Sequence, residues 1–447
     1  MSFGELFPKI VEPPPGPRAR ALCERLGVLE APGVNTLAAG GAPSILWQEA
    51  CGANVLDVDG NIYIDLTSGF GVAAVGHRHR RVVAAVTRQA GLLLHGLGDV
   101  HAHPLRVDLA FRLLALAPLD EPRIFFAVSG AEAVEIALKT ALATTGRPGI
   151  LAFDPSYHGL TMGALAATSR PEFRTPFAAH LHRHVRRLPY GCATGRAAAI
   201  LARGATGAVL VEPIVGREGV LVPPPGWLAA LSELCRAHGA LLVADEILTG
   251  FGRTGTLFAV EHEAVRPDLL CCGKALGGGL PIAAVLARQP LFGCWQTGGE
   301  ALHTSTFLAN PLACAAALAV LEVLERERLP ERARRLGAAV GARLQGWPRR
   351  FRQVAATRGR GLLWGVELRS RQAAARCAAA ARDRGVLLLS GGPAGRVLQI
   401  LPPLTITPAQ LDRALEILEA SLDAAPDEAA AAAAGRHSVR EPSGARE

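Results

Sequence analysis

The chain has 447 residues, half of them hydrophobic, and a formal net charge of +8. Its length allows two or three domains with a large core, and no apolar stretch reaches the roughly 20 residues that a bilayer-spanning helix needs. The arginines form no single basic run with interleaved aromatic residues, so the charge does not indicate a nucleic-acid-binding protein.

Nine cysteines stand at scattered positions, an odd number without a Cys-x-x-Cys pair. This spacing favours reduced thiols over a disulfide framework or a zinc knuckle. Residues 1–8 lack the basic segment and apolar run of a signal peptide. Together these features predict a cytoplasmic protein.

The first 60 residues predict an arm followed by a β-meander, both part of a small domain. Prolines crowd residues 13–17, and a short helical pattern covers 18–26. The turn Asp59-Gly60-Asn61 is a strong hairpin signal. Strands are expected at 45–48, 55–58 and 62–66.

From about residue 105 onward, short apolar strands alternate with helical patterns such as 131–144 and 227–238. The strands are expected at 124–128, 150–153, 208–212, 241–245, 269–272 and 282–287. This alternation is typical of a mainly parallel sheet with helices on both faces. We therefore predict a large α/β domain over residues 61–320.

A smaller α+β region follows, entered by a helical pattern at 313–325. We predict a small domain over 321–422 and a disordered tail over 423–447, which is rich in Ala without periodicity. The strands of the small domain are expected near 361–368, 386–389 and 397–401.

Lysine is rare in this chain: Lys and Arg together number 47, and only three of them are Lys. Lys9 and Lys139 have ordinary surroundings, whereas Lys274 stands between an apolar strand and the glycine triplet 277–279. Arginine stays protonated, but a desolvated lysine can lose its proton and form a Schiff base. Lys274 is therefore the candidate nucleophile.

Polar groups follow the other strands at their carboxyl ends, where open α/β sheets place ligands. Ser129-Gly130-Ala131 opens a helix, and helix N-termini bind phosphate. A plain Ser N-cap explains that motif equally well. Tyr157 could stack on a planar cofactor, although a packed loop tyrosine is the commoner case.

Asp245 and Glu246 end a buried strand, where two carboxylates are costly unless paired. One could hold a protonated ring nitrogen and the other an arginine. A pyridoxal-phosphate enzyme needs a Schiff-base lysine, a group facing the ring nitrogen and a phosphate cradle. That cofactor explains Lys274, Asp245 and the helix at 129–131 together.

These motifs carry a family resemblance over most of the chain, from about Pro14 to Thr407. The run from Asp245 to Gly255, followed by the run from Pro267 to Pro281, resembles the class III (ω-amino-acid) aminotransferases. The resemblance implies the aspartate-aminotransferase fold (fold type I), with a seven-stranded, mainly parallel sheet, and pyridoxal 5'-phosphate as cofactor. It also implies a homodimer or higher homo-oligomer that moves an amino group from an amino acid or ω-amine to a 2-oxo acid by a ping-pong mechanism.

The resemblance assigns roles to individual residues. Lys274 would carry the cofactor as a Schiff base and shuttle the proton, and Asp245 would pair with the pyridinium nitrogen. Glu212 would lie at the substrate side, where relatives often pair it with an arginine. The remaining residues of the implied cofactor site are Ser129, Gly130, Ala131, Tyr157, His158, Ile247, Ser305 and Thr306, the last two reaching the phosphate of a neighbouring subunit.

The chain departs from the family pattern at four positions. Ala131 replaces a usual Thr and Leu248 a usual Gln. Leu160 and Gln399 stand where many members have carboxylate-binding arginines, which predicts weaker use of α-carboxylates and of 2-oxoglutarate. Glu212 then lacks its expected partner unless an arginine such as Arg217 or Arg396 supplies it.

Other classes fit less well. Gly273-Lys274 is followed by Ala and lacks the preceding glycine of a P-loop. Histidines alternate at three places without Cys or carboxylate partners, so we expect no metal site. The alternatives that stay open share the cofactor: an amino-acid racemase or a decarboxylating transaminase on the same scaffold.

Overall fold

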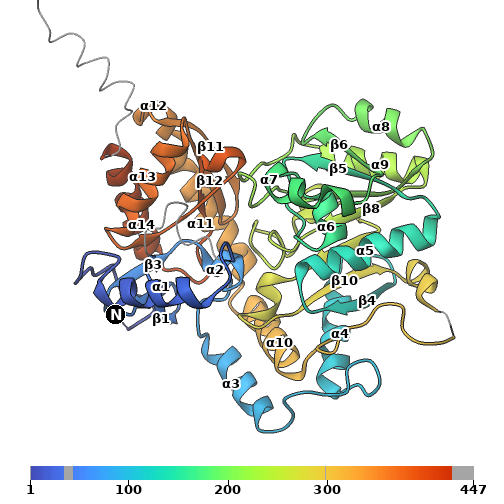
Figure 1. Ribbon diagram of the computed structural model, residues 1–447, viewed down its shortest axis with the longest axis horizontal. Coiled ribbons are helices and arrows are strands. Elements are labelled where there is room, and N and C mark those ends of the chain that lie inside the picture. The colour runs from blue at the N-terminus through green and yellow to red at the C-terminus, as the bar shows by residue number, and fades with distance from the viewer. Residues whose placement is uncertain (1, 35–43, 297, 425–447) are drawn as a thin grey trace, which may run out of the picture.

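The computed structural model describes residues 2–34, 44–296 and 298–424. The described chain forms two lobes (Figure 1). One lobe holds the largest sheet, and the other combines N-terminal and C-terminal elements, blue and orange to red in the figure. The predicted disordered tail lies almost entirely outside the described residues, and the domain boundaries expected at 60, 320 and 422 stay predictions.

The largest sheet has seven strands in the order β4-β10-β9-β8-β7-β5-β6. Strands β9, β8, β7, β5 and β6 pair in parallel. Strand β10 is antiparallel to both of its neighbours, β9 and the edge strand β4, so β4 runs in the same direction as the parallel strands. The predicted fold class is thus confirmed. The strands are β4 (Pro122–Ala127), β5 (Gly149–Asp154), β6 (Val185–Pro189), β7 (Thr206–Val211), β8 (Leu241–Asp245), β9 (Leu269–Cys272) and β10 (Ala283–Arg288).

Strand β6 was not among the expected strands. Its sequence Val-Arg-Arg-Leu-Pro has only two large apolar residues, because it is an edge strand paired on one side by β5. Both faces of the inner strands are buried, in two separate clusters. Leu151 and Phe153 face one cluster and Ile150 and Ala152 the other, as the two-residue period of a strand requires.

Helices cover this sheet on both faces. Helix α5 (Gly130–Thr145) packs in the same cluster as Ile150, and α9 (Trp227–His238) packs in the cluster of Leu151. The other helices of this part of the chain are α4 (Pro104–Leu116), α6 (Met162–Ala167), α7 (Pro171–Arg174), α8 (Gly195–Leu201) and α10 (Pro311–Arg326). Helix α3 (Arg80–Ala90) lies against α10, away from the sheet (Figure 1).

The predicted β-meander is confirmed, and it pairs with a distant segment. Strands β1 (Trp47–Cys51), β2 (Asn54–Asp57) and β3 (Ile62–Asp65) are antiparallel, and β13 (Val386–Leu387) joins β3 in parallel. The Asp57 carboxylate holds the hairpin by accepting from the amide N of Asn61 at 2.8 Å. N-terminal and C-terminal residues therefore share one sheet.

The third sheet has the order β11-β12-β15-β14. Its strands are β11 (Val354–Arg360), β12 (Leu363–Leu368), β14 (Leu389–Gly391) and β15 (Val397–Ile400). The prediction of one strand over 386–389 was wrong, since the chain leaves one sheet after Leu387 and enters another at Leu389. The start at 361 was wrong as well, because Gly361 makes the turn between β11 and β12 with a φ of 58°.

The remaining helices flank this lobe: α1 (Pro17–Leu29), α2 (Ser68–Gly71), α11 (Leu329–Gln345), α12 (Trp347–Arg350), α13 (Arg371–Arg382) and α14 (Pro408–Asp423). Buried Arg253 joins the lobes by donating to the carbonyls of Leu362, at 3.0 Å, and Pro402, at 2.6 Å. Among the described residues, no helix is both long and apolar enough to cross a membrane, and no group of side chains has the makings of a metal site.

Candidate active site

The site lies where β5, β7, β8 and β9 end. Asp245, the last residue of β8, is 4 % exposed, and its Oδ2 lies 2.8 Å from Nδ1 of the buried His158. Its Oδ1 accepts from the amide N of Ile247 at 3.1 Å. The imidazole and the amide fix the carboxylate in one orientation, so it can present a negative charge to a ligand at the sheet edge.

Lys274 follows β9 directly and opens the short helix η3 (Lys274–Gly277). Its φ of 41° is in the left-handed region, which residues other than glycine seldom adopt and which is commonest at functional sites. Burial lowers the pKa of its amine, with the charge of Arg217 acting in the same direction and those of Asp245 and Glu212 opposing it. The site therefore favours the neutral, nucleophilic amine more than water does.

Glu212 follows β7 and braces two loops. Its Oε1 accepts from the amide N of Tyr157 and its Oε2 from that of Gly216, both at 2.9 Å. Burial raises the pKa of Glu212 to about 7, with the charge of Asp245 adding to the shift and that of His158 opposing it. Among the described residues no arginine pairs with Glu212, and its two carboxylate oxygens are held by backbone amides instead.

The phosphate-binding candidate is the N-terminus of α5. Ser129 caps it by accepting from the amide N of Glu132 at 3.2 Å, while the first-turn amides of Gly130 and Ala131 have no acceptor within the helix. A Cβ at Gly130 would lie 2.9 Å from Cδ1 of Ile247. Glycine thus lets Ile247 pack against the helix start, which brings two segments of the implied cofactor site together.

Tyr157 has a cation on its ring. Cζ of Arg217 lies 4.3 Å from the centroid of the Tyr157 ring and 5.0 Å from that of Phe173. The two rings meet edge to face at 6.4 Å. The expected aromatic residue is therefore at the site, together with an arginine that the motifs did not place.

Ser305 and Thr306 are not joined to this site within one chain. They lie in the loop before α10, where their carbonyl oxygens would be 3.7 and 3.5 Å from a Cβ at Gly98. No hydrogen bond among the described residues connects their hydroxyls to the start of α5. Thr306 is exposed and is therefore accessible to another subunit. Its contact with a neighbouring subunit stays a prediction.

Two of the family departures, Leu248 and Gln399, have close contacts in the structure. The Leu248 side chain lies so close to Gly216 and Gly71 that a Cβ there would be 2.0 and 2.6 Å from its methyl carbons. Leu160 is 51 % exposed. Gln399 is buried, and its Nε2 donates to the carbonyls of Gly216, at 3.1 Å, and Arg217, at 2.9 Å.

Two residues of the Asp245–Gly255 run have roles that the sequence did not reveal. Glu246 pairs with no arginine, contrary to one expectation; it accepts from the hydroxyl of Thr249 and from the amide N of Val260 at 2.8 Å. Arg253, fully buried between the lobes, binds carbonyls rather than a ligand. In the sequence, Arg253 stands out only because its neighbours are three glycines and two threonines, which gave no indication that it would join the two lobes.

These residues fit pyridoxal phosphate. A lysine with a lowered pKa stands in the field of an oriented carboxylate, and the Nε2 of His158 is buried without a partner among the described residues. Helix amides beside them suit a phosphate. Fold and site together define a pyridoxal-phosphate enzyme of fold type I.

Comparisons with known proteins agree. Residues 37–422 match the family model of aminotransferase class-III. The acetylornithine aminotransferase of Mycobacterium bovis is 44% identical over 388 residues, which are 86% of this chain and 93% of that protein. That of Methanothermobacter thermautotrophicus is 40% identical over 370 residues, which are 82% and 91%.

Among solved structures, an ornithine aminotransferase from Toxoplasma gondii superposes with a TM-score of 0.82 and 32% identity, covering 90% of this chain and 94% of that one. The chain belongs to the class III aminotransferases. It is a pyridoxal-phosphate-dependent transferase acting on a small amino donor and an oxo-acid acceptor. The racemase and decarboxylating alternatives are not favoured by these relatives.

Proposed function

We propose that Lys274 is the cofactor-binding and proton-transferring residue of this aminotransferase, and that Asp245 is its electrostatic partner. The observation that carries the proposal is the position of Lys274 at the end of β9, in the electrostatic field of the Asp245–His158 pair at the end of β8. When bound, pyridoxal phosphate supplies an electron sink that makes the Cα–H bond of an amino compound labile.

The chain's own residues supply the rest of the chemistry. Lys274, whose pKa burial lowers, would accept the Cα proton and return it. Asp245 would hold the ring nitrogen, oriented by His158. Gly130 and Ala131 would hold the phosphate through backbone amides at the start of α5. Tyr157 would pack on one ring face and Ile247 on the other.

The first donors to test are those of the relatives: N-acetylornithine and ornithine, whose aminotransferases resemble this chain. We infer a ping-pong exchange with a 2-oxo acid. Purified enzyme is mixed with each donor without acceptor, and the cofactor absorbance and released product are followed. One donor should convert the cofactor to its amine form; if no amine or amino acid does so, the proposed function is wrong.

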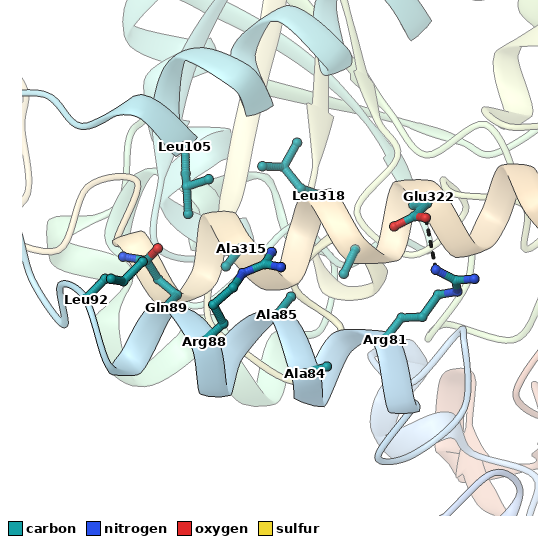
Figure 2. A pocket seen from close by; sticks show the side chains of 11 residues that line it. Arg81, Ala84, Ala85, Arg88, Gln89, Leu92, Leu105, Ala315, Leu318 and Glu322 are labelled. Atoms are coloured by element: carbon teal, nitrogen blue, oxygen red, sulfur yellow. Dashed lines mark hydrogen bonds and ion pairs between the residues drawn. The ribbon is translucent and has the colours of Figure 1, made fainter.

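We further infer a homodimer. A broad apolar surface is exposed around α3, α4 and the loop before α10, and Thr306 lies in that loop. Its large exposed residues include Leu92, Leu94, Val100, Val107, Phe111 and Phe307. Figure 2 shows the adjoining groove between α3 and α10, bordered by the Arg81–Glu322 ion pair of 3.1 Å.

We infer that a second copy of the chain covers this surface, because the family resemblance expects Ser305 and Thr306 of a neighbouring subunit to complete the phosphate site. The exposure of these large apolar side chains supports a subunit interface there. We also infer a cytoplasmic location, supported by nine cysteines that are all free in the structure.

A further inference from the structure

One arginine at the site has no counter-charge. No carboxylate and no hydrogen-bond acceptor in the described part of the chain contacts the guanidinium of Arg217. The side chain is half-buried, and its guanidinium lies over the rings of Tyr157 and Phe173. A ring face stabilises a guanidinium while leaving its N–H edges free to bind.

The backbone beneath Arg217 is firmly held. Its carbonyl accepts from Nε2 of Gln399 at 2.9 Å and from the amide N of Gly392 at 3.0 Å. The next residue, Glu218, is 1 % exposed and paired with Arg170 at 2.8 Å. The side chain thus projects from a fixed loop between two anchors, as a preorganised binding group does.

The position of this arginine is informative. Its charge lowers the pKa of Lys274, so the guanidinium lies within electrostatic range of the reacting amine. The two positions where relatives commonly have carboxylate-binding arginines carry Leu160, which is uncharged, and Gln399, whose amide is used by the loop. An unpaired, oriented cation beside the amine fits an anionic substrate group.

We propose that Arg217 is the specificity-determining residue that binds the substrate carboxylate, and that Gln399 is a positioning residue for it. The inference rests on the proposed function and deepens it: the substrates of this site carry a carboxylate, and one loop arginine replaces the two that the chain lacks. A bidentate guanidinium–carboxylate pair in a partly dry site is worth roughly ten- to a hundred-fold in affinity.

The test compares two donors that differ only in a carboxylate, ornithine and 1,4-diaminobutane. Arg217→Gln should lower the ratio of kcat/KM for ornithine to that for the diamine by about ten-fold or more. Arg217→Lys keeps the charge but loses the planar guanidinium that binds a carboxylate through two N–H groups, so its ratio should lie between those of wild type and Arg217→Gln. Arg396→Gln is the matched control, because Arg396 pairs with Glu367 at 3.2 Å, and should leave the ratio within about two-fold.

A binding measurement separates this inference from the reaction itself. Glutarate, an unreactive dicarboxylate, is titrated into the cofactor-loaded protein by calorimetry. Arg217→Gln should weaken its binding about ten-fold or more, and Arg396→Gln should not. Equal binding to wild type and Arg217→Gln, or none to wild type, overturns the assignment. If glutarate binding depends on Arg217 but no donor reacts, the carboxylate site stands and the aminotransferase proposal fails.

Discussion

At the scale of single residues, burial decides what the polar groups of the site can do. Lys274 and Glu212 both shift toward their neutral forms, and desolvation is the largest cause in each. Asp245 is held differently, by hydrogen bonds from an imidazole and an amide. The same strand-end cluster thus combines an amine whose pKa is lowered with an oriented carboxylate, a combination that suits proton transfer at Cα.

Lys274→Arg should abolish turnover while leaving the protein folded. A guanidinium keeps the charge but neither gives up its proton nor attacks a carbonyl at neutral pH, so kcat should fall at least about 100-fold. Steady-state assays measure this, and borohydride reduction followed by peptide mapping should find the pyridoxyl group on Lys274. Lys9→Arg, at an exposed position, is the control; a label on Lys9 or Lys139 would contradict the assignment.

Glu246 gives a pH-dependent prediction. Burial raises its pKa to about 7 from the ordinary 4.5, so the folded state keeps a proton that the unfolded state has lost. Stability is therefore full below pH 4.5 and decreases as the pH rises to 7, by about 3 kcal/mol for this group. Glu246→Gln should remove this decrease in stability with pH, because glutamine does not titrate.

Melting temperatures of wild type and Glu246→Gln should be compared from pH 4.5 to 8. As the pH rises across this range, the melting temperature of the variant should increase relative to that of wild type by a few degrees. The shift is small because a free-energy difference of about 3 kcal/mol is divided by the large unfolding entropy of a long chain. Other titrating groups are common to both proteins and cancel in the difference. A difference that stays constant with pH would show that the Glu246 pKa is ordinary.

At the scale of elements, two central strands with both faces buried were predicted to the residue, whereas two polar edge strands were missed. Strands β8 and β9 are continuous apolar runs, and their observed bounds equal the expected ones. Edge strands β6 and β11 carry arginines and glycine and were missed. A strand at the edge of a sheet is less completely covered by other elements, so it can carry polar residues and its apolar pattern is weaker.

Gly361 should be essential to the β11–β12 turn. With a φ of 58°, a Cβ there would meet the backbone C of Thr254 at 2.3 Å, and that backbone cannot yield as a side-chain end can. Gly361→Ala should cost more than about 3 kcal/mol, combining left-handed strain with overpacking. Denaturant unfolding of each variant measures this cost.

Gly146→Ala is the matched control for strain alone. Gly146 ends α5 with a φ of 66°, and nothing lies within 4 Å of its Cβ position. This change should cost only about 1–2 kcal/mol. Equal losses at the two glycines would mean that the contact of Gly361 with Thr254 is unimportant.

At the scale of the whole molecule, the proposed dimer makes a quantitative prediction. Lys274→Ala and Thr306→Glu should each be inactive, the second because a carboxylate would oppose the neighbour's phosphate. Random exchange of equal amounts gives half hybrid dimers, each with one intact site of two, and so about a quarter of wild-type activity. Light scattering should show a dimer; no recovery despite proven subunit exchange would place the whole site in one chain.

The sequence alone determined the class of fold and the cofactor, and it led to the proposed roles of Lys274 and Asp245. These depend on local runs: apolar strands, glycine turns and the residues that follow them. Tertiary structure decided what depends on distant contacts. It assigned both oxygens of Glu212 to amides, gave the amide of Gln399 to the Gly216–Arg217 backbone, and placed Arg217 over Tyr157. Such pairings join residues up to 183 positions apart, and no local pattern encodes them.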